Sequence, residues 1–293
     1  MRLAGANTMS KPYSFIPFLP VQEYTDEGKI TGKINIKIET LTPLHISSGY
    51  LEEENDLIYK QFIRFNGIPI IPGTSLKGCI RTIAETISYS CYLNSKEVDF
   101  NKFSQFKSDK NQNCIICNMF GAMGKRSKIR FGDLYCKEVD AKSKITILKI
   151  PKFYKPHPDE SLYYQNGKYK GYKFYHHGDS KILQKGEVAY EFIDKGAVFE
   201  GSVWFENLTE NQVNLLCFSL GLDGSIQPKL GYAKPAYYGS IKITTDETRW
   251  IEAAKKYQNH KDAKIKRNIN QLIEILNYEK GKKTVSEWNE GTY

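Results

Sequence analysis

Residues 68–85 read IPIIPGTSLKGCIRTIAE, a short apolar run that enters Pro-Gly and continues with apolar residues at helical spacing. The pattern predicts a strand that turns directly into a helix over 74–90, with Thr74 or Ser75 capping the N-terminus. Free backbone N–H groups and the positive end of the helix dipole make such a terminus a natural phosphate site. A phosphate-binding role is therefore the first hypothesis, and a plain helix cap is the simpler alternative.

Two further features extend the phosphate hypothesis. Lys77 and Arg81 lie four residues apart, so we expect them on one face of the helix beside its terminus. Residues 229–235, KLGYAKP, form a glycine-bearing loop with exposed amides, two lysines and one aromatic ring. Such a loop fits a phosphodiester contact with base stacking. Gly/Pro turns before strands are common, so the loop alone is a weak signal.

The elements around the helix predict an α+β fold. Strands are predicted at 33–41, 128–136, 196–207 and about 237–244. Thr209 opens a second helix, and Gln212 completes its capping box. The order β, α, β, a long insertion, β, α, β approximates the split βαβ arrangement of ferredoxin-like and RRM domains. In that arrangement one sheet face carries the helices, and the other can lie against RNA.

The predicted domain covers 11–245, with insertions at about 91–127 and 143–192, and a charged helical tail at 246–293. The second insertion is too long for an ordinary connection, so we expect a hairpin or a partner-binding element. The acidic stretch 52–56 is expected to form an exposed loop. In the tail, an amphipathic stripe is predicted from Ile265, Ile269, Leu272, Ile273 and Leu276.

The composition favours a basic protein that can bind RNA. The net charge is +9, and the chain holds 20 tyrosines and 15 phenylalanines. Lysines and arginines can hold phosphates while rings stack on bases, although a solubilising surface explains the charge equally well. No apolar run approaches the roughly 20 residues that span a bilayer, and no signal segment is found. A cytoplasmic location without membrane contact is the expectation.

Three cysteines form a predicted structural zinc site. Cys114 and Cys117 have the C-x-x-C spacing that lets two thiolates bind one tetrahedral ion, and Cys91 is the best third ligand. Cys79, Cys136 or a histidine remains open as the fourth ligand. Buried free thiols are the alternative, and a redox role is weak without a thioredoxin-like context. A disulfide framework is not expected in an intracellular chain.

Four ordered segments carry a family resemblance: TPLHISSG at 42–49, residues 68–85, CIICNMFG at 114–121 and KLGYAKPAYYGSIKI at 229–243. With them the chain resembles the RAMP superfamily of CRISPR-associated proteins, especially the backbone subunits of type III effector complexes. A type III-associated subfamily adds KPYSFIP at 11–17, KGYKFYHH at 170–177 and FENLT at 205–209. The likeness runs from about residue 11 to 244.

The resemblance implies a modified RRM fold in which both loops lie near the CRISPR RNA. By motif it makes Ser75, Lys77 and Arg81 guide-backbone contacts. By position in the loop it adds Gly231, Tyr232 and Lys234. Family loops more often read Gly-x-Gly, and Ala233 departs from that pattern. Lys229, Lys173 and His177 complete the predicted RNA-binding set.

The implied function is a CRISPR RNA-binding backbone subunit with target RNA, other effector subunits and copies of itself as partners. The 143–192 insertion would be a thumb-like hairpin across the guide–target duplex. Asp56 is the nearest match to an aspartate that cleaves target RNA with Mg²⁺; Glu53 and Glu54 compete, and an inactive acidic loop is the alternative. Other hypotheses are a metal-independent nuclease that matures precursor CRISPR RNA through His45 or His177, and a non-catalytic capping or adaptor subunit.

Overall fold

A computed structural model describes residues 11–91, 114–137, 140, 143–151, 153, 163–165, 168–179 and 186–284. Its main sheet has the strand order β15-β2-β14-β8-β6-β5, and β7 also pairs with β14. The strands are β2 (Ile30–Thr40), β5 (Arg64–Phe65), β6 (Ile68–Ile71), β7 (Ile129–Phe131), β8 (Leu134–Cys136), β14 (Val198–Leu208) and β15 (Ile241–Thr244). The mixture of this sheet with packed helices confirms the α+β class.

The predicted alternation in the first strand decides which face of the sheet is buried. In β2, Ile34, Ile36 and Ile38 are at most 2% exposed, whereas Lys33 and Lys37 point to solvent. Successive side chains of a strand point to opposite faces, so one face of the sheet is the floor of the core. Within the described part of the chain, the side chains of the opposite face, such as Lys33 and Lys37, are exposed.

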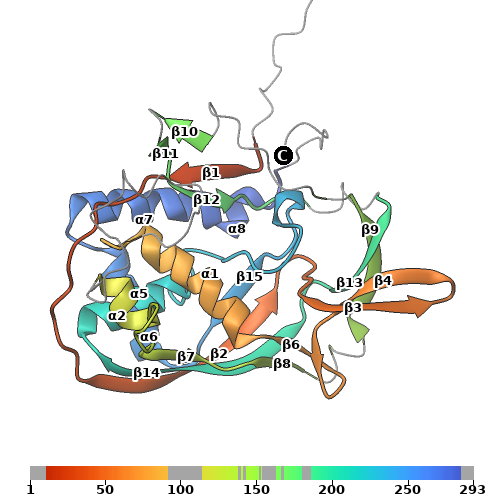
Figure 1. Cartoon of the computed structure of the whole chain (residues 1–293), viewed down its shortest axis with the longest axis horizontal. Helices are drawn as coiled ribbons and strands as arrows, with labels where there is room; N and C mark the ends of the chain where they lie inside the picture. Colours follow the sequence, from red (N-terminus) through yellow and green to blue (C-terminus); the bar gives the residue numbers. More distant parts are fainter. Residues whose placement is uncertain are drawn as a thin grey trace, which may run out of the picture.

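The helices lie on one side of the main sheet (Figure 1). They are α1 (Gly73–Thr86), α2 (Ile115–Phe120), α5 (Glu210–Ser219), α6 (Thr248–Gln258), α7 (Ala263–Leu276) and α8 (Tyr278–Gly281). The capping box of Thr209 and Gln212 on α5 is confirmed. Helices α6 and α7 of the predicted tail are part of the main hydrophobic core, which includes Trp250, Tyr257 and Leu272. The apolar stripe of α7 is buried as predicted, with Ile273 partly buried.

The predicted cap of α1 by Thr74 or Ser75 is wrong. Pro72 is the N-cap residue, and the amides of Ser75 and Leu76 donate to its carbonyl at 3.0 and 3.1 Å. The amide of Gly73 donates to Asp133 Oδ1 at 2.8 Å. A carbonyl and a carboxylate therefore accept from three amides of this terminus, and neither hydroxyl serves as the cap.

A second sheet has the order β3-β4-β13-β9. Its strands are β3 (Ser47–Glu54), β4 (Leu57–Phe62), β9 (Ile145–Ile150) and β13 (Val188–Ile193). The expectation of a loop at 52–56 is wrong, because the stretch is the exposed end of the β3–β4 hairpin, which projects from the body (Figure 1). Asn55 and Asp56 form its turn with φ of 51° and 61°.

The 143–192 insertion is more than one hairpin. Its ends, β9 and β13, pair antiparallel within the second sheet. Its middle supplies β12 (Tyr172–Tyr175), which pairs with β1 (Tyr13–Ile16), and the small pair β10 (Tyr164–Gln165) and β11 (Lys168–Tyr169). The insertion thus packs partly against α7 through β12. Most of the insertion at 91–127 lies outside the described residues.

The last predicted strand begins late. Residues 234–236 form a 3-10 turn, Tyr237 has a φ of 66°, and β15 starts at Ile241.

Among the described residues, no helix combines the length and the apolar character that crossing a membrane requires.

Candidate nucleic-acid interface

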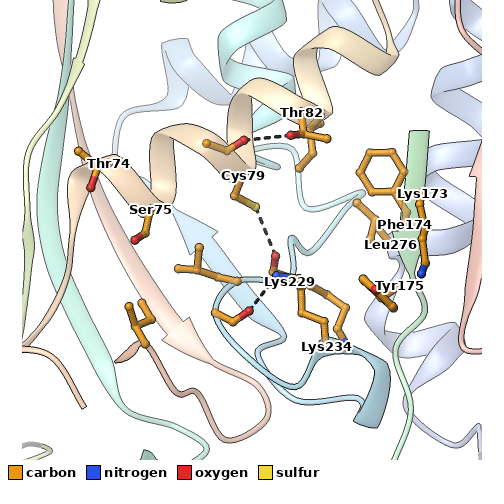
Figure 2. Close-up of a pocket in the computed structure, with 15 residues that line it drawn as sticks. Thr74, Ser75, Cys79, Thr82, Lys173, Phe174, Tyr175, Lys229, Lys234 and Leu276 are labelled. Carbon is orange, nitrogen blue, oxygen red and sulfur yellow. Dashed lines mark hydrogen bonds between the residues drawn. The ribbon is translucent and has the colours of Figure 1, made fainter. Parts of the chain in front are cut away.

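A pocket of about 500 Å³ lies between one face of α1, the 229–234 loop and β12. Figure 2 shows side chains from all three segments around it. The helix contributes Thr74, Ser75, Gly78, Cys79, Thr82 and Ile83, the loop Lys229, Leu230, Gly231 and Lys234, and β12 Lys173, Phe174 and Tyr175; Ile46 and Leu276 complete the lining. The two segments that sequence analysis assigned to phosphate therefore meet at one site.

The loop adopts a backbone that requires glycine at its centre. Gly231 has a φ of 78°, and a Cβ there would lie 2.3 Å from the carbonyl oxygen of His45. The amide of Tyr232 donates to the same carbonyl at 2.9 Å. Ala233, which stands where related loops more often have glycine, has a left-handed backbone conformation with φ 56° and ψ 27°. It occupies a conformation that favours glycine, so the strained backbone is kept without one.

Three lysines of the pocket are held away from bulk water. Lys229 is 7% exposed, donates to the carbonyl of His176 at 3.0 Å, and has its pKa lowered well below the ordinary value by burial. Burial likewise lowers the pKa of Lys234, whose Nζ donates to the carbonyl of Gly231 at 2.8 Å. Among the described residues that line the pocket there is no aspartate or glutamate.

Lys173 stands at the edge of the pocket within a group of tyrosines. Its Nζ donates to the hydroxyl of Tyr163 at 2.7 Å and lies 4.0 Å from the centroid of the Tyr13 ring. Burial, followed by the charge of Lys11, lowers the pKa of Lys173 to about 8. An anion in the pocket would favour the charged form of all three lysines, so the site is electrostatically suited to phosphate.

The helix presents its small polar residues to the pocket and its cations elsewhere. Gly78 is exposed and would have open space around a Cβ. Lys77 instead donates to Ser127 Oγ at 2.9 Å. Arg81 Nε donates to Glu85 at 2.8 Å, and its Nη1 to the carbonyl of Gly121 at 3.1 Å. Neither lines the pocket, so the predicted guide contacts of Lys77 and Arg81 are contacts within the protein in this structure.

Sequence analysis did not assign Thr74, Thr82, Cys79 or Tyr175 to RNA binding, although all four line the pocket. A usable signal was present on the helix. Ser75, Gly78 and Thr82 recur at spacings of three and four residues, which places them on one helical face.

Two rings of the predicted RNA-binding set are turned inward. Tyr232 stacks on Tyr190 at 4.8 Å between ring centroids and does not line the pocket. His177 is 0% exposed; its Nδ1 lies 2.8 Å from Ser240 Oγ, and burial lowers its pKa to about 3. His177 is thus enclosed by the protein, whereas Tyr232 is partly buried and keeps some exposed surface, and an RNA contact of either residue stays a prediction.

The histidine of the second sheet is also buried. His45 is 1% exposed, its Nδ1 lies 2.7 Å from the carbonyl oxygen of Glu191, and burial lowers its pKa. Both histidines of the metal-independent nuclease hypothesis are thus inaccessible to a ribose or a phosphate.

A model of the RAMP superfamily matches residues 37–232, well over half of the chain. This chain belongs to the RAMP superfamily. The family indicates a CRISPR-associated protein that binds RNA. No curated protein matches the chain.

The acidic hairpin of this RAMP protein stands apart from the pocket. Asp56 lies in the exposed turn, and Glu52 accepts a hydrogen bond from Gln61 Nε2 at 2.8 Å. Within the described part of the chain, the carboxylates of Glu53, Glu54 and Asp56 do not form a group that could hold a metal. Any Mg²⁺ there would need ligands from RNA or from another subunit.

The three predicted cysteines of this RAMP protein do converge. The thiols of Cys91, Cys114 and Cys117 are buried and lie within 4.8 Å of one another, and Cys91 Sγ is 3.4 Å from Cys114 and 3.2 Å from Cys117. Hydrogen bonds from Cys117 and Cys91 lower the pKa of Cys114. The group can hold a metal ion. Neither Cys79 nor Cys136 belongs to it; the Cys79 thiol donates to the carbonyl of Lys229.

Proposed function

We propose that this chain is a backbone-type subunit of a type III CRISPR effector ribonucleoprotein and that it holds the sugar–phosphate backbone of CRISPR RNA in the pocket between α1 and the 229–234 loop. One observation carries the proposal. Lys229 is buried and Lys234 is partly buried beside the pocket, and no carboxylate of the described residues lines it. Burying ammonium groups costs free energy unless an anion compensates, and an RNA phosphate supplies that anion.

The strand order supports a modified ferredoxin-like or RRM arrangement. In chain order, β2, α1 and β7–β8 form one βαβ unit, and β14, α5 and β15 form a second. In the sheet, β14 lies between β2 and β8, and β2 lies between β14 and β15. Each unit is thus split by a strand of the other, and this order supports the proposed RRM-like arrangement.

Two finer parts of the proposal concern metals. The cysteine group suits a structural Zn²⁺, because thiolates are its preferred ligands and corners of a tetrahedral site lie about 3.8 Å apart when Zn–S is about 2.3 Å. Metal analysis of the purified chain tests this part.

The projecting hairpin supports a role for Asp56 in target RNA cleavage with Mg²⁺, since an exposed carboxylate at its tip can reach a splayed phosphate.

The pocket is tested by removing charge at its two partly buried lysines, Lys173 and Lys234. Lys173→Gln with Lys234→Gln should weaken binding of CRISPR RNA to the chain at least about tenfold and reduce the salt slope of log K by about 2. The matched control is Lys261→Gln with Lys264→Gln, two exposed lysines near the start of α7, which should change affinity little. Equal affinity of both double variants would contradict the pocket assignment.

The cleavage part has its own experiment in the assembled effector complex. Asp56→Ala should abolish cutting of complementary RNA while leaving guide and target binding unchanged. Glu53→Ala and Glu54→Ala serve as controls. If one of these variants loses cutting and Asp56→Ala does not, that glutamate is the catalytic residue in place of Asp56. Cleavage of precursor RNA by the isolated chain in EDTA would favour the maturation nuclease.

A further inference from the structure

The open face of the main sheet carries a tryptophan between two cations. Trp204 of β14 lies directly opposite Lys33 of β2 on one side and Arg130 of β7 on the other. Lys33 Nζ is 5.6 Å and Arg130 Cζ is 4.8 Å from the indole centroid. Because cross-strand partners share a face, the three side chains form one row across three strands on the side away from the helices.

The sheet makes room for this ring. Gly132 lies beside the edge of the indole ring, and a Cβ at this position would come within 2.8 Å of Trp204 Cζ3. The indole is half-buried, whereas Lys33 and Arg130 are exposed. The sheet thus presents one partly exposed aromatic ring flanked by two exposed cations.

The charges of the row differ from those of their neighbours. Along the same face, Lys37 pairs with Asp246 at 2.8 Å, and Lys137 pairs with Glu200 at 3.1 Å. Within the described part of the chain, Lys33 and Arg130 have no carboxylate partner. Their charge is therefore available to an anion from outside.

A second aromatic position lies on the same face. Tyr135 of β8 and Phe65 of β5 are 42% and 53% exposed and meet edge to face at 6.3 Å. Tyr135 pairs with Glu200, four residues along β14 from Trp204, which corresponds to about 13 Å of strand. Ring positions at intervals beside cations are what a single nucleic-acid strand requires, because bases stack and phosphates pair.

We infer that this open face binds single-stranded nucleic acid, with a base stacked at Trp204 and the flanking phosphates paired with Lys33 and Arg130. The site lies on the face of the sheet opposite α1 and hence away from the pocket (Figure 1). The open face would bind a different segment of nucleic acid from the one held between α1 and the 229–234 loop. This inference goes beyond the proposed function and does not depend on the pocket.

The test uses the full chain with a labelled oligouridine strand, ultraviolet cross-linking and peptide mapping. The parent background is Lys173→Gln with Lys234→Gln, in which pocket binding is weakened. In that background Trp204→Ala should reduce the remaining affinity about tenfold and remove the cross-link to β14. Trp204→Phe should restore most of the affinity, and Arg130→Gln should lower it and its salt slope.

Lys261→Gln is the matched charge control, and a melting curve of each variant shows that the fold persists. If affinity and cross-links of Trp204→Ala equal those of the parent, the inference is overturned while the pocket proposal stands. If Trp204→Ala alone abolishes all binding in the otherwise native chain, the pocket proposal fails and this one holds. The inference would also be overturned if, in the assembled complex, Trp204 contacted a neighbouring protein subunit and not RNA.

Discussion

The two sides of α1 carry similar charges and use them differently. On the pocket side, Lys229 and Lys234 donate to carbonyls beside a cavity that no carboxylate of the described residues lines. On the other side, Arg81 pairs with Glu85 and Lys77 donates to Ser127, next to α2 and β7. The difference teaches that a basic residue near a phosphate-binding motif is informative only when it faces a cavity and its charge is not neutralised by a carboxylate of the protein.

The largest expected effect lies on the side that is satisfied internally. Arg81→Gln leaves the carboxylate of Glu85, which is 7% exposed, without its cation, and should lower the free energy of unfolding by about 2–3 kcal/mol. RNA affinity of the folded variant should stay unchanged. Chemical denaturation and RNA titration at low temperature measure the two quantities. If Arg81→Gln had native stability but no longer bound RNA, Arg81 would be an RNA contact and not an internal partner of Glu85.

A smaller effect should appear with pH on the pocket side. The pKa of Lys173 is lowered to about 8, so the free protein loses this charge as the pH rises above that value. RNA affinity should fall about tenfold between pH 7 and pH 9, because binding requires the charged form. Stability has the opposite sign: the unfolded chain binds more protons between the lowered pKa and the ordinary value, so the free protein becomes more stable across that window.

Affinity and melting curves over this pH range measure both trends. Lys173→Gln should remove most of the pH dependence and is the natural control. An affinity that is flat from pH 7 to 9 in the native chain would show that Lys173 does not face the bound RNA.

The smallest effect concerns the loop backbone. Ala233→Gly relieves a left-handed conformation that costs an alanine about 1 kcal/mol, while it also gives the unfolded chain more freedom. We therefore expect a gain in stability of less than about 1 kcal/mol with RNA affinity unchanged. Thermal unfolding measures it, and Gly231→Ala, whose Cβ would lie 2.3 Å from His45 O, should be strongly destabilised by comparison.

Much of the fold followed from local patterns. The alternation in β2, the capping box at Thr209 and the apolar stripe of α7 each depend on residues close in sequence, and each is present. The convergence of the 74–82 and 229–234 segments was anticipated from the family resemblance together with the glycine pattern. The cysteine group was anticipated from the C-x-x-C spacing and a nearby thiol.

Other features were decided by distant contacts. Helical spacing placed Lys77 and Arg81 together but could not say which face of α1 meets the 229–234 loop. The acidic stretch at 52–56 was recognised as exposed, while its pairing into a hairpin depends on β4, which in turn pairs with β13. Tyr232 and His177 have the chemistry of RNA ligands, yet Tyr232 stacks on Tyr190 and is partly buried, and His177 is fully buried beside Ser240.

The amino-acid sequence by itself determined the α+β class, the elements that carry the two loops and the three thiols that could share a metal, because these rest on short-range periodicity and motif spacing. Only the tertiary structure decided which lysines face a cavity, which rings are buried, and that Trp204 lies between Lys33 and Arg130 on an open sheet. The physical reason is that burial and partnership of a side chain are set by segments far away in the chain, and these fix whether a charge is left for an external ligand.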